Sequence, residues 1–188
     1  TIANVICKDN CQQLKEMFYF AQNTGADSIY YTLLDTVGGT EALLPDANEA
    51  GILLRDAELL LQESLAYRPE KRLRLENFDG FVRRLNCLKS GSDSYDSESV
   101  NTIPCYAGWT FSRILADGNV VPCCRGVNKV MGNVNFEDFA RIWHNQLYNS
   151  FRSKAKYLDK DAPYFSTISC SKMCDNLMHN QEIHKRLG

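Results

Sequence analysis

The sequence lacks the charge imbalance that is typical of nucleic-acid-binding proteins. Its 188 residues include 21 Lys and Arg against 23 Asp and Glu, a formal net charge of −2. General nucleic-acid binders usually carry a basic excess, so we expect no nucleic-acid partner. No apolar run approaches the roughly 18 residues of a membrane-spanning helix, so we expect no membrane partner either.

The chain also lacks a recognisable leader. Its first residues do not resemble a signal peptide. However, the chain begins at Thr1 and not at Met, so we expect upstream sequence to be missing. Apolar residues make up 44% of the chain, which is enough to bury the core of one large domain or two small ones.

A polar segment divides the sequence into two halves. Residues 90–99 read SGSDSYDSES, a run with nothing to bury. This composition is typical of an exposed linker. We therefore expect a linker at residues 89–102, between a first domain of residues 1–88 and a second domain of residues 103–188.

The first half has the pattern of an α/β domain. Short apolar runs alternate with segments of helical periodicity, an order that predicts parallel βα units. Three strands are too few to close a barrel, so the sheet is either small and open or part of something larger. We expect strands at residues 3–7, 28–34 and 72–76, and helices from residue 14 to Gly25, over 48–66 and over 78–88.

The second half predicts a β-hairpin and then helices, an α+β pattern. Asp117-Gly118 separates two apolar runs, residues 109–116 and 119–124. An Asp-Gly pair favours a two-residue turn in which both residues have positive φ. The helices expected after the hairpin start at the N-cap residue Asn135 and cover residues 146–156 and 175–187.

Cysteine is abundant, with eight in the chain. Cys105 precedes the hairpin and Cys123 ends it, with the turn at Gly118 between them, so both thiols can lie at the same end. Cys170 and Cys174 can supply two more ligands from a loop-to-helix junction. Four converging thiolates suit an iron–sulfur cluster or a tetrahedral zinc ion.

Cys123 and Cys124 are neighbours, and only one of them should face such a site. Adjacent side chains in a strand point to opposite faces. We expect Cys123 to be the ligand because of its four-residue spacing from Gly118, and Cys124 to be a packed thiol. Two alternatives remain open for the four cysteines, namely a zinc site and ordinary thiols.

Longer motifs around these cysteines resemble the SPASM/twitch domain, the C-terminal extension of many radical S-adenosylmethionine (SAM) enzymes. The family pattern is a cysteine, nine to fifteen residues, a glycine, four residues and a second cysteine. Here the two intervals are twelve and four. The resemblance covers about residues 103–175, through Pro104-Cys105-x3-Trp109, DGNVVPCC at 117–124, MGNV at 131–134 and Ile142-Trp143.

The resemblance implies one auxiliary [4Fe–4S] cluster bound by Cys105, Cys123, Cys170 and Cys174. Full SPASM domains carry about seven such cysteines for two clusters, whereas the shorter twitch type holds one. Less specifically, the first half resembles the last βα units of a radical SAM partial TIM-like barrel. The implied fold class is therefore α/β, with these barrel units followed by a small α+β SPASM/twitch-like domain.

The Cys-x3-Cys-x2-Cys motif of this family is absent from the sequence. We therefore expect the chain to be the C-terminal part of a longer cytoplasmic enzyme and to be inactive alone. The N-terminal half of the barrel would be its partner and would hold SAM and a second [4Fe–4S] cluster. A peptide, protein or small-molecule substrate and an electron donor would complete the system.

The resemblance also implies a reaction. The parent enzyme would cleave SAM reductively and modify its substrate by oxidoreductase chemistry, and the auxiliary cluster would relay an electron or position the substrate. Four protein thiolates leave no iron site open, which favours relay over substrate ligation. The alternative hypothesis is a zinc-stabilised interaction module without enzymatic activity.

Overall fold

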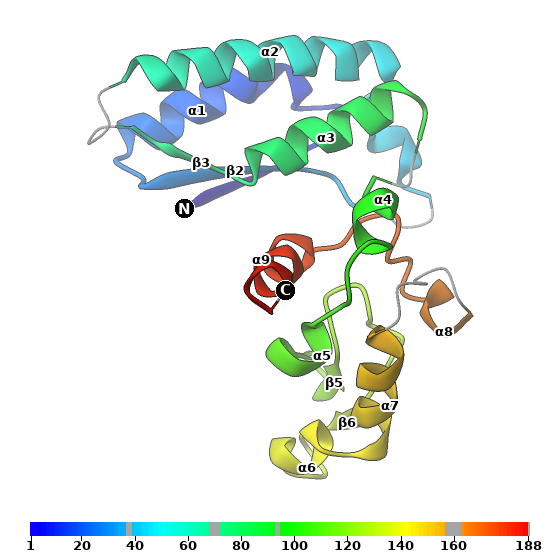
Figure 1. Ribbon diagram of the computed structural model, residues 1–188. Helices are drawn as coiled ribbons and strands as arrows, with labels where there is room; N and C mark the ends of the chain where they lie inside the picture. The colour runs from blue at the N-terminus through cyan, green and yellow to red at the C-terminus, as the bar shows by residue number, and fades with distance from the viewer. Residues whose placement is uncertain (37–38, 68–71, 93–94, 157–162, 188) are drawn as a thin grey trace. The chain divides into compact units, whose positions relative to one another are not determined.

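The computed structural model describes residues 1–36, 39–67, 72–92, 95–156 and 163–187. The chain divides into two compact units, Thr1–Tyr95 and Asp96–Gly188. In the described residues we find nine α-helices and two three-stranded sheets, one sheet in each unit (Figure 1). The expected mixed α/β composition is therefore confirmed.

The first unit is built on a parallel sheet, as the sequence predicts. Its strand order is β1-β2-β3, and both strand pairs are parallel. In Figure 1 the helices α1 and α2 lie together on one side of this sheet. The elements are β1 (Ile2–Ile6), η1 (Cys11–Gln13), α1 (Leu14–Asn23), β2 (Ser28–Leu33), η2 (Glu41–Leu43), α2 (Ala47–Ala66), β3 (Arg74–Glu76) and α3 (Phe78–Lys89).

The central strand β2 anchors the core of this unit. Its alternate residues Ile29, Tyr31 and Leu33 are almost completely buried, as strand periodicity requires for a face that is covered by helices. The ring of Tyr31 stacks on Phe81 of α3 at 5.7 Å. Its hydroxyl donates to the Leu14 carbonyl of α1 at 3.0 Å. This one side chain therefore ties two helices to the sheet.

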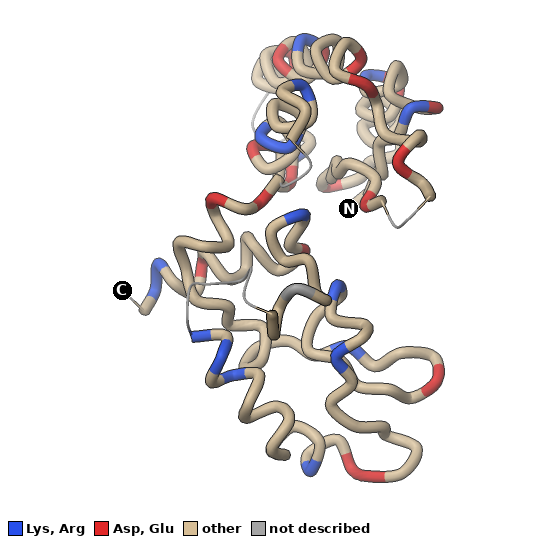
Figure 2. The backbone as a smooth tube through the Cα atoms, turned by 90° about the vertical axis from the view of Figure 1, so that its right-hand side faces the viewer, with Lys and Arg blue, Asp and Glu red and all other residues tan. Residues whose placement is uncertain are grey.

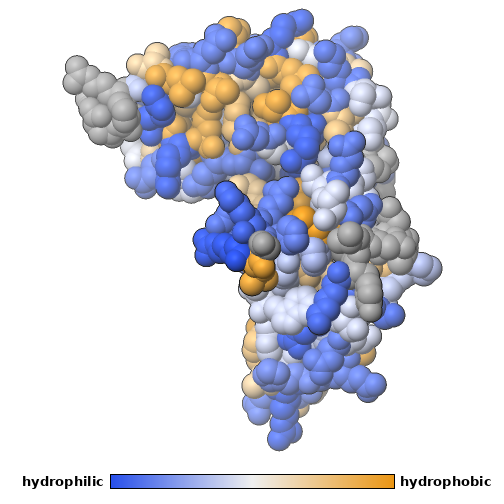
Figure 3. Space-filling model, in the orientation of Figure 1, coloured by the Kyte–Doolittle hydropathy of each residue, from blue (hydrophilic) through white to orange (hydrophobic). Residues whose placement is uncertain are grey.

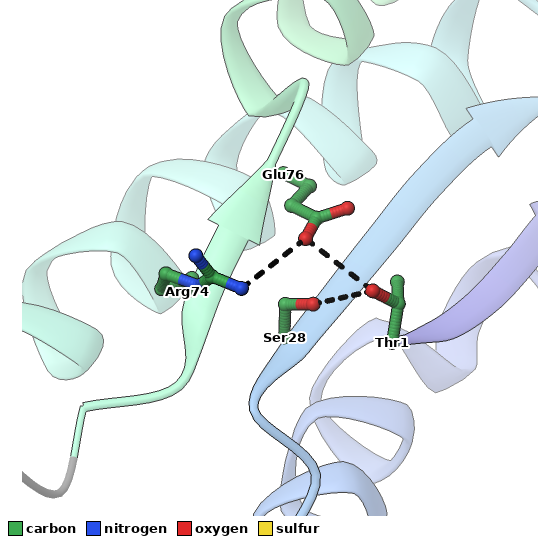
Figure 4. A network of polar contacts seen from close by, with 4 residues as sticks. All are labelled: Thr1, Ser28, Arg74 and Glu76. Carbon is green, nitrogen blue, oxygen red and sulfur yellow. Dashed lines mark hydrogen bonds and ion pairs between the residues drawn. The ribbon is translucent and has the colours of Figure 1, made fainter.

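A polar network joins the three strands near the N-terminus (Figure 4). The hydroxyls of Thr1 and Ser28 lie 2.6 Å apart, and Thr1 also donates to Glu76 at 3.3 Å. Arg74 pairs with the same carboxylate at 3.8 Å. Hydrogen bonding by Ser28 and then Thr1 lowers the pKa of Glu76. These contacts link the N-terminal residue to β2 and β3.

Apolar and charged surfaces are both present on this unit. Apolar side chains gather on the face that carries α2 and α3 (Figure 3). Among them Ile52 and Leu61 line a groove between these two helices, together with Arg55 and Lys89. Charges of both signs occur in each unit (Figure 2). Among the helices that the structure describes, none is both long enough and apolar enough to cross a membrane.

The second unit combines short helices with a small antiparallel sheet of order β4-β5-β6. Its core includes Val120 and Met131 from the sheet region and Tyr148 and Phe151 from a helix. The elements are α4 (Ser97–Val100), α5 (Ala107–Thr110), β4 (Arg113–Ile114), β5 (Asn119–Val121), β6 (Gly132–Asn133), α6 (Phe139–Trp143), α7 (Gln146–Ala155), α8 (Pro163–Ser166) and α9 (Leu177–Leu187).

Two expected boundaries in this unit are wrong. The first hairpin strand does not start at residue 109, because Trp109 belongs to α5 and β4 begins at Arg113. Asn135 is not an N-cap, because α6 starts later and its N-cap is Asp138. The Asn135 backbone N–H instead donates to the Asn133 side chain at 2.8 Å, which forms a turn before the helix.

The expected linker is only partly exposed. Tyr95 and Asp96 are 3% and 1% exposed, and Ser97–Val100 form α4. The expectation of a wholly exposed segment is therefore wrong at these residues; positions 93 and 94 lie outside the described part. The division between units falls after Tyr95. The domain limits at 88 and 103 stay predictions.

Candidate metal centre

The site begins with the hairpin that carries Cys123. Backbone pairing continues past the strands to Leu115, whose N–H donates to Asn119 O at 2.8 Å. The Gly118 N–H donates to Leu115 O at 2.9 Å, and Gly118 has φ +83°. The loop is therefore a three-residue turn that ends in a left-handed glycine. The expected two-residue turn with positive φ at both Asp117 and Gly118 is wrong, because only Gly118 adopts it.

Gly118 is held against the segment that follows β6. The side chains of Asn133 and Asn135 each donate to the Asp117 carbonyl at 3.0 Å. The Val134 N–H donates to Gly118 O at 3.0 Å. A Cβ on Gly118 would lie 2.2 Å from Asn135 Nδ2. The glycine of the motif therefore serves both the turn and this close approach.

Cys123 and Cys124 follow the hairpin in a bend and not in a strand. β5 ends at Val121, and the Gly126 N–H donates to Cys123 O at 3.1 Å. Strand alternation therefore does not extend to this pair, and the expectation that Cys123 and Cys124 lie in a strand is wrong. Cys123 packs against the core of the unit, whereas Cys124 is not part of that packing.

The segment with Cys170 and Cys174 is held by a buried carboxylate. Asp96 is 1% exposed, and its Oδ2 accepts the Cys174 N–H at 2.7 Å. The Asp96 N–H donates to Ser171 O at 3.1 Å. Because both bonds reach the same short loop, Asp96 fixes the positions of these two cysteines from 74 or more residues away in sequence.

Cys105 is held from two other elements. Its N–H donates to Ala155 O at the end of α7 at 2.9 Å. Asn180 of α9 accepts the N–H of the next residue, Tyr106, at 2.9 Å. The Asn180 Nδ2 lies 3.9 Å from Cys105 Sγ and donates to it. Cys105 is thus placed between α7 and α9.

The structure brings the four expected ligands around one pocket. The pocket is small, about 30 Å³. Its walls are mostly apolar. The residues lining it are Cys105, Ala107, Cys123, Cys124, Arg125, Phe151, Phe165, Ile168, Cys170, Met173, Cys174, Asp175 and Asn176.

The thiols influence one another through their charges. Burial raises the pKa of Cys123 to about 12, and the thiolates of Cys170 and Cys105 add to the rise. Burial also raises the pKa of Cys174, with further contributions from Cys105 and Cys170. Burial and then Asp175 raise the pKa of Cys124. The raised pKa values of Cys123 and Cys174 therefore both reflect the neighbouring thiols of Cys105 and Cys170.

The donor set fits a metal group that neutralises thiolates. Buried thiolates so close together repel one another, and a bound cation relieves that repulsion. Within the described residues no three His, Cys, Asp or Glu side chains already stand in the geometry of a single bound ion. Four thiols around one pocket match the donor set of a [4Fe–4S] cluster.

The remaining cysteines lie elsewhere. Cys7, Cys11 and Cys87 belong to the first unit. Sequence reasoning missed Asp96 and Asn180, which support the site through contacts 78 and 75 residues apart. No local motif marks either residue.

Comparison with known proteins identifies this region. Residues 105–175 match the family model of SPASM, described as an iron–sulfur cluster-binding domain. The matched segment contains all four expected ligands. No curated protein matches the sequence.

A solved structure extends the similarity to the whole chain. Native anSMEcpe with bound AdoMet and Kp18Cys peptide matches with a TM-score of 0.52 at 15% identity, over 94% of this chain and 49% of that chain. The chain thus spans about half the length of that protein. At this identity the likeness shows a shared fold, and together with the SPASM match it supports the expected resemblance to a radical SAM enzyme with a SPASM domain.

Proposed function

We propose that this chain is the C-terminal part of a radical SAM enzyme and that its second unit binds one auxiliary [4Fe–4S] cluster. Cys105, Cys123, Cys170 and Cys174 would be the ligands. The observation that carries the proposal is that these four thiols line one pocket, where Cys105 and Cys170 add to the raised pKa values of Cys123 and Cys174. They also all lie within the segment that matches an iron–sulfur cluster-binding domain.

The protein's part in this function is to place and shield the ligands. The hairpin turn at Gly118 returns the chain toward Cys105, and Asp96 fixes the loop of Cys174. Apolar side chains such as Phe151 and Phe165 limit access of water to the sulfurs. A bound cluster supplies one-electron chemistry. With four protein thiolates around it, the site suits electron relay better than direct ligation of substrate.

The first unit would belong to the wall of a larger barrel. Parallel sheets are usually covered on both faces. This sheet has only three strands, which are too few to close a barrel. The N-terminal half of such a barrel would be supplied by sequence outside this chain, together with SAM and a second [4Fe–4S] cluster. The similarity to anSMEcpe over 94% of this chain supports this arrangement.

We favour a peptide or protein substrate over a small molecule. The support is that anSMEcpe was solved with a bound peptide. Reduction of the clusters would require an external electron donor, and we propose that the reaction takes place in the cytoplasm. Selectivity for the substrate would depend on loops and on the other half of the enzyme.

Anaerobic reconstitution of the 188-residue chain with iron and sulfide tests the proposal. We expect a brown protein with about four irons and four acid-labile sulfides per chain, as one cubane cluster requires. Seven or eight irons would indicate two clusters and contradict the single-cluster assignment. A colourless protein that retains one zinc ion would support the structural alternative.

Matched cysteine variants provide the control. Cys174→Ser should lose most of the bound iron, because it removes one ligand from the pocket. Cys87→Ser should retain it, because Cys87 lies in the first unit and its thiol contacts the Tyr95 carbonyl. Equal iron in the two variants would show that the cluster, if present, is bound elsewhere.

A further inference from the structure

The amide of Asn180 faces a sulfur of the site. Asn180 lies in α9 and is 4% exposed. Its side chain makes two contacts, one with the Tyr106 N–H at 2.9 Å and one with Cys105 Sγ at 3.9 Å. Because the residue is buried, water does not compete readily for either contact.

The first contact fixes the orientation of the amide. A backbone N–H can only donate, so the atom that faces Tyr106 must be the carbonyl oxygen of Asn180. The NH₂ group is then the part that points to Cys105 Sγ. The assignment of oxygen and nitrogen therefore follows from the hydrogen bonding and is not arbitrary.

We propose that Asn180 is a positioning residue that tunes the auxiliary cluster. Its Nδ2–H group donates to the Cys105 sulfur and raises the reduction potential of the cluster. This inference rests on the proposed function, because it requires a cluster bound through Cys105. It assigns a role to a residue of α9 that lies outside the SPASM match at residues 105–175.

The direction of the effect follows from electrostatics. Reduction adds one negative charge to the cluster and its thiolates. A hydrogen-bond donor aimed at a ligand sulfur stabilises the more negative state more than the oxidised one, and such bonds are among the determinants of cluster potential. Removal of the donor should therefore make the potential more negative.

Two substitutions at this position separate the donor from the packing. Asn180→Leu removes the contact with Cys105 and also the acceptor for Tyr106. Asn180→Asp is nearly isosteric and retains that acceptor, but it replaces the donor with a carboxylate oxygen. The added negative charge should lower the potential further, so we expect the order wild type, then Asn180→Leu, then Asn180→Asp.

The chain offers a control for merely structural damage. The Tyr106 hydroxyl and His184 Nδ1 lie 3.0 Å apart and join the same two segments. Tyr106→Phe removes this contact without touching the hydrogen bond to sulfur. If Asn180 served only to hold α9 in place, Tyr106→Phe should shift the potential in the same direction.

The test is an anaerobic redox titration of the reconstituted 188-residue chain, followed by visible absorbance and by electron paramagnetic resonance of the reduced cluster. We expect a more negative potential in both Asn180 variants and the wild-type potential in Tyr106→Phe. The inference is overturned if an iron-loaded Asn180 variant keeps the wild-type potential, or if Tyr106→Phe shifts as far.

Iron content separates failure of the inference about Asn180 from failure of the proposed function. Wild-type protein that takes up no iron would contradict the proposed function itself, whatever Asn180 does. If wild type and Tyr106→Phe load fully while neither Asn180 variant loads, Asn180 is needed for assembly, and tuning of the potential is refuted. If all four proteins bind iron, their reduction potentials decide whether Asn180 tunes the cluster.

Discussion

Replacement of Gly118 by alanine should destabilise the second unit more than a left-handed glycine position alone would explain. Gly118 has φ +83°, which costs an L-residue about 1–2 kcal/mol. The new Cβ would also lie 2.2 Å from Asn135 Nδ2 and 2.8 Å from Asn133 Oδ1. Both side chains would have to move from the positions in which they bond the Asp117 carbonyl.

The expected loss of stability has two parts, the strain of the left-handed backbone and the displacement of the two asparagines. A lost hydrogen bond costs about 1 kcal/mol, so displacement of Asn133 and Asn135 adds about 2 kcal/mol to the strain at Gly118. A total of about 3–4 kcal/mol lowers the melting temperature of a 60–100-residue domain by roughly 12–32 °C. The turn carries the chain back toward the site, so we also expect Gly118→Ala to bind less iron.

Thermal unfolding by circular dichroism measures the effect, and Gly25→Ala is the matched control. Gly25 has φ +71°, but a Cβ there would meet nothing within 4 Å. The control should therefore show only the strain of about 1–2 kcal/mol. Equal losses of stability in the two variants would refute the role assigned to Asn133 and Asn135.

Three further predictions follow from the same structure. Asp96→Ala should destabilise the second unit by about 1–3 kcal/mol, because the Cys174 N–H loses its acceptor. Chemical denaturation measures this loss of stability. Asp96→Asn should recover much of the lost stability, because it retains an oxygen acceptor. In the metal-free chain Cys123 should alkylate slowly at pH 7, because its pKa is raised to about 12. The alkylation rate should rise about tenfold per pH unit between pH 7 and 10, because the thiolate fraction grows. A rate that levels off near pH 9 would contradict that pKa. The reconstituted, reduced chain should form no 5′-deoxyadenosine from SAM above a protein-free blank, because it lacks the Cys-x3-Cys-x2-Cys motif.

The parallel sheet and most helices could be predicted because their signals are local. Apolar periodicity located α1, and the left-handed Gly25 marks the end of that helix as expected. The aromatic and β-prone residues of segment 28–34 identified β2, whose buried face includes Tyr31. Such patterns depend on residues close in sequence, and they predict an element correctly when that element buries one face.

The turn and cap errors have a different cause. Asp117-Gly118 is compatible with more than one hairpin turn, and the pairing of Leu115 with Asn119 selects the three-residue form. Asn135 has a suitable side chain for an N-cap, but that side chain bonds the Asp117 carbonyl instead. In both places a contact with another segment overrides the local preference.

The support of the site could not be predicted for a similar reason. The four cysteines were found by their spacing, but Asp96 and Asn180 reach them from distant segments. Composition suggested that the segment around Asp96 is exposed, yet its carboxylate is buried against the loop of Cys174. Only the tertiary structure brings such residues to the ligands.

The most direct test of the central claim compares iron content in Cys123→Ala and Cys124→Ala after anaerobic reconstitution. Both residues line the pocket, but Cys170 and Cys105 add to the raised pKa of Cys123, whereas Asp175 is the largest charge contribution that raises the pKa of Cys124. We predict that Cys123→Ala loses the cluster and that Cys124→Ala retains about four irons, as one cubane requires. Iron retained in Cys123→Ala and lost in Cys124→Ala would contradict the ligand assignment.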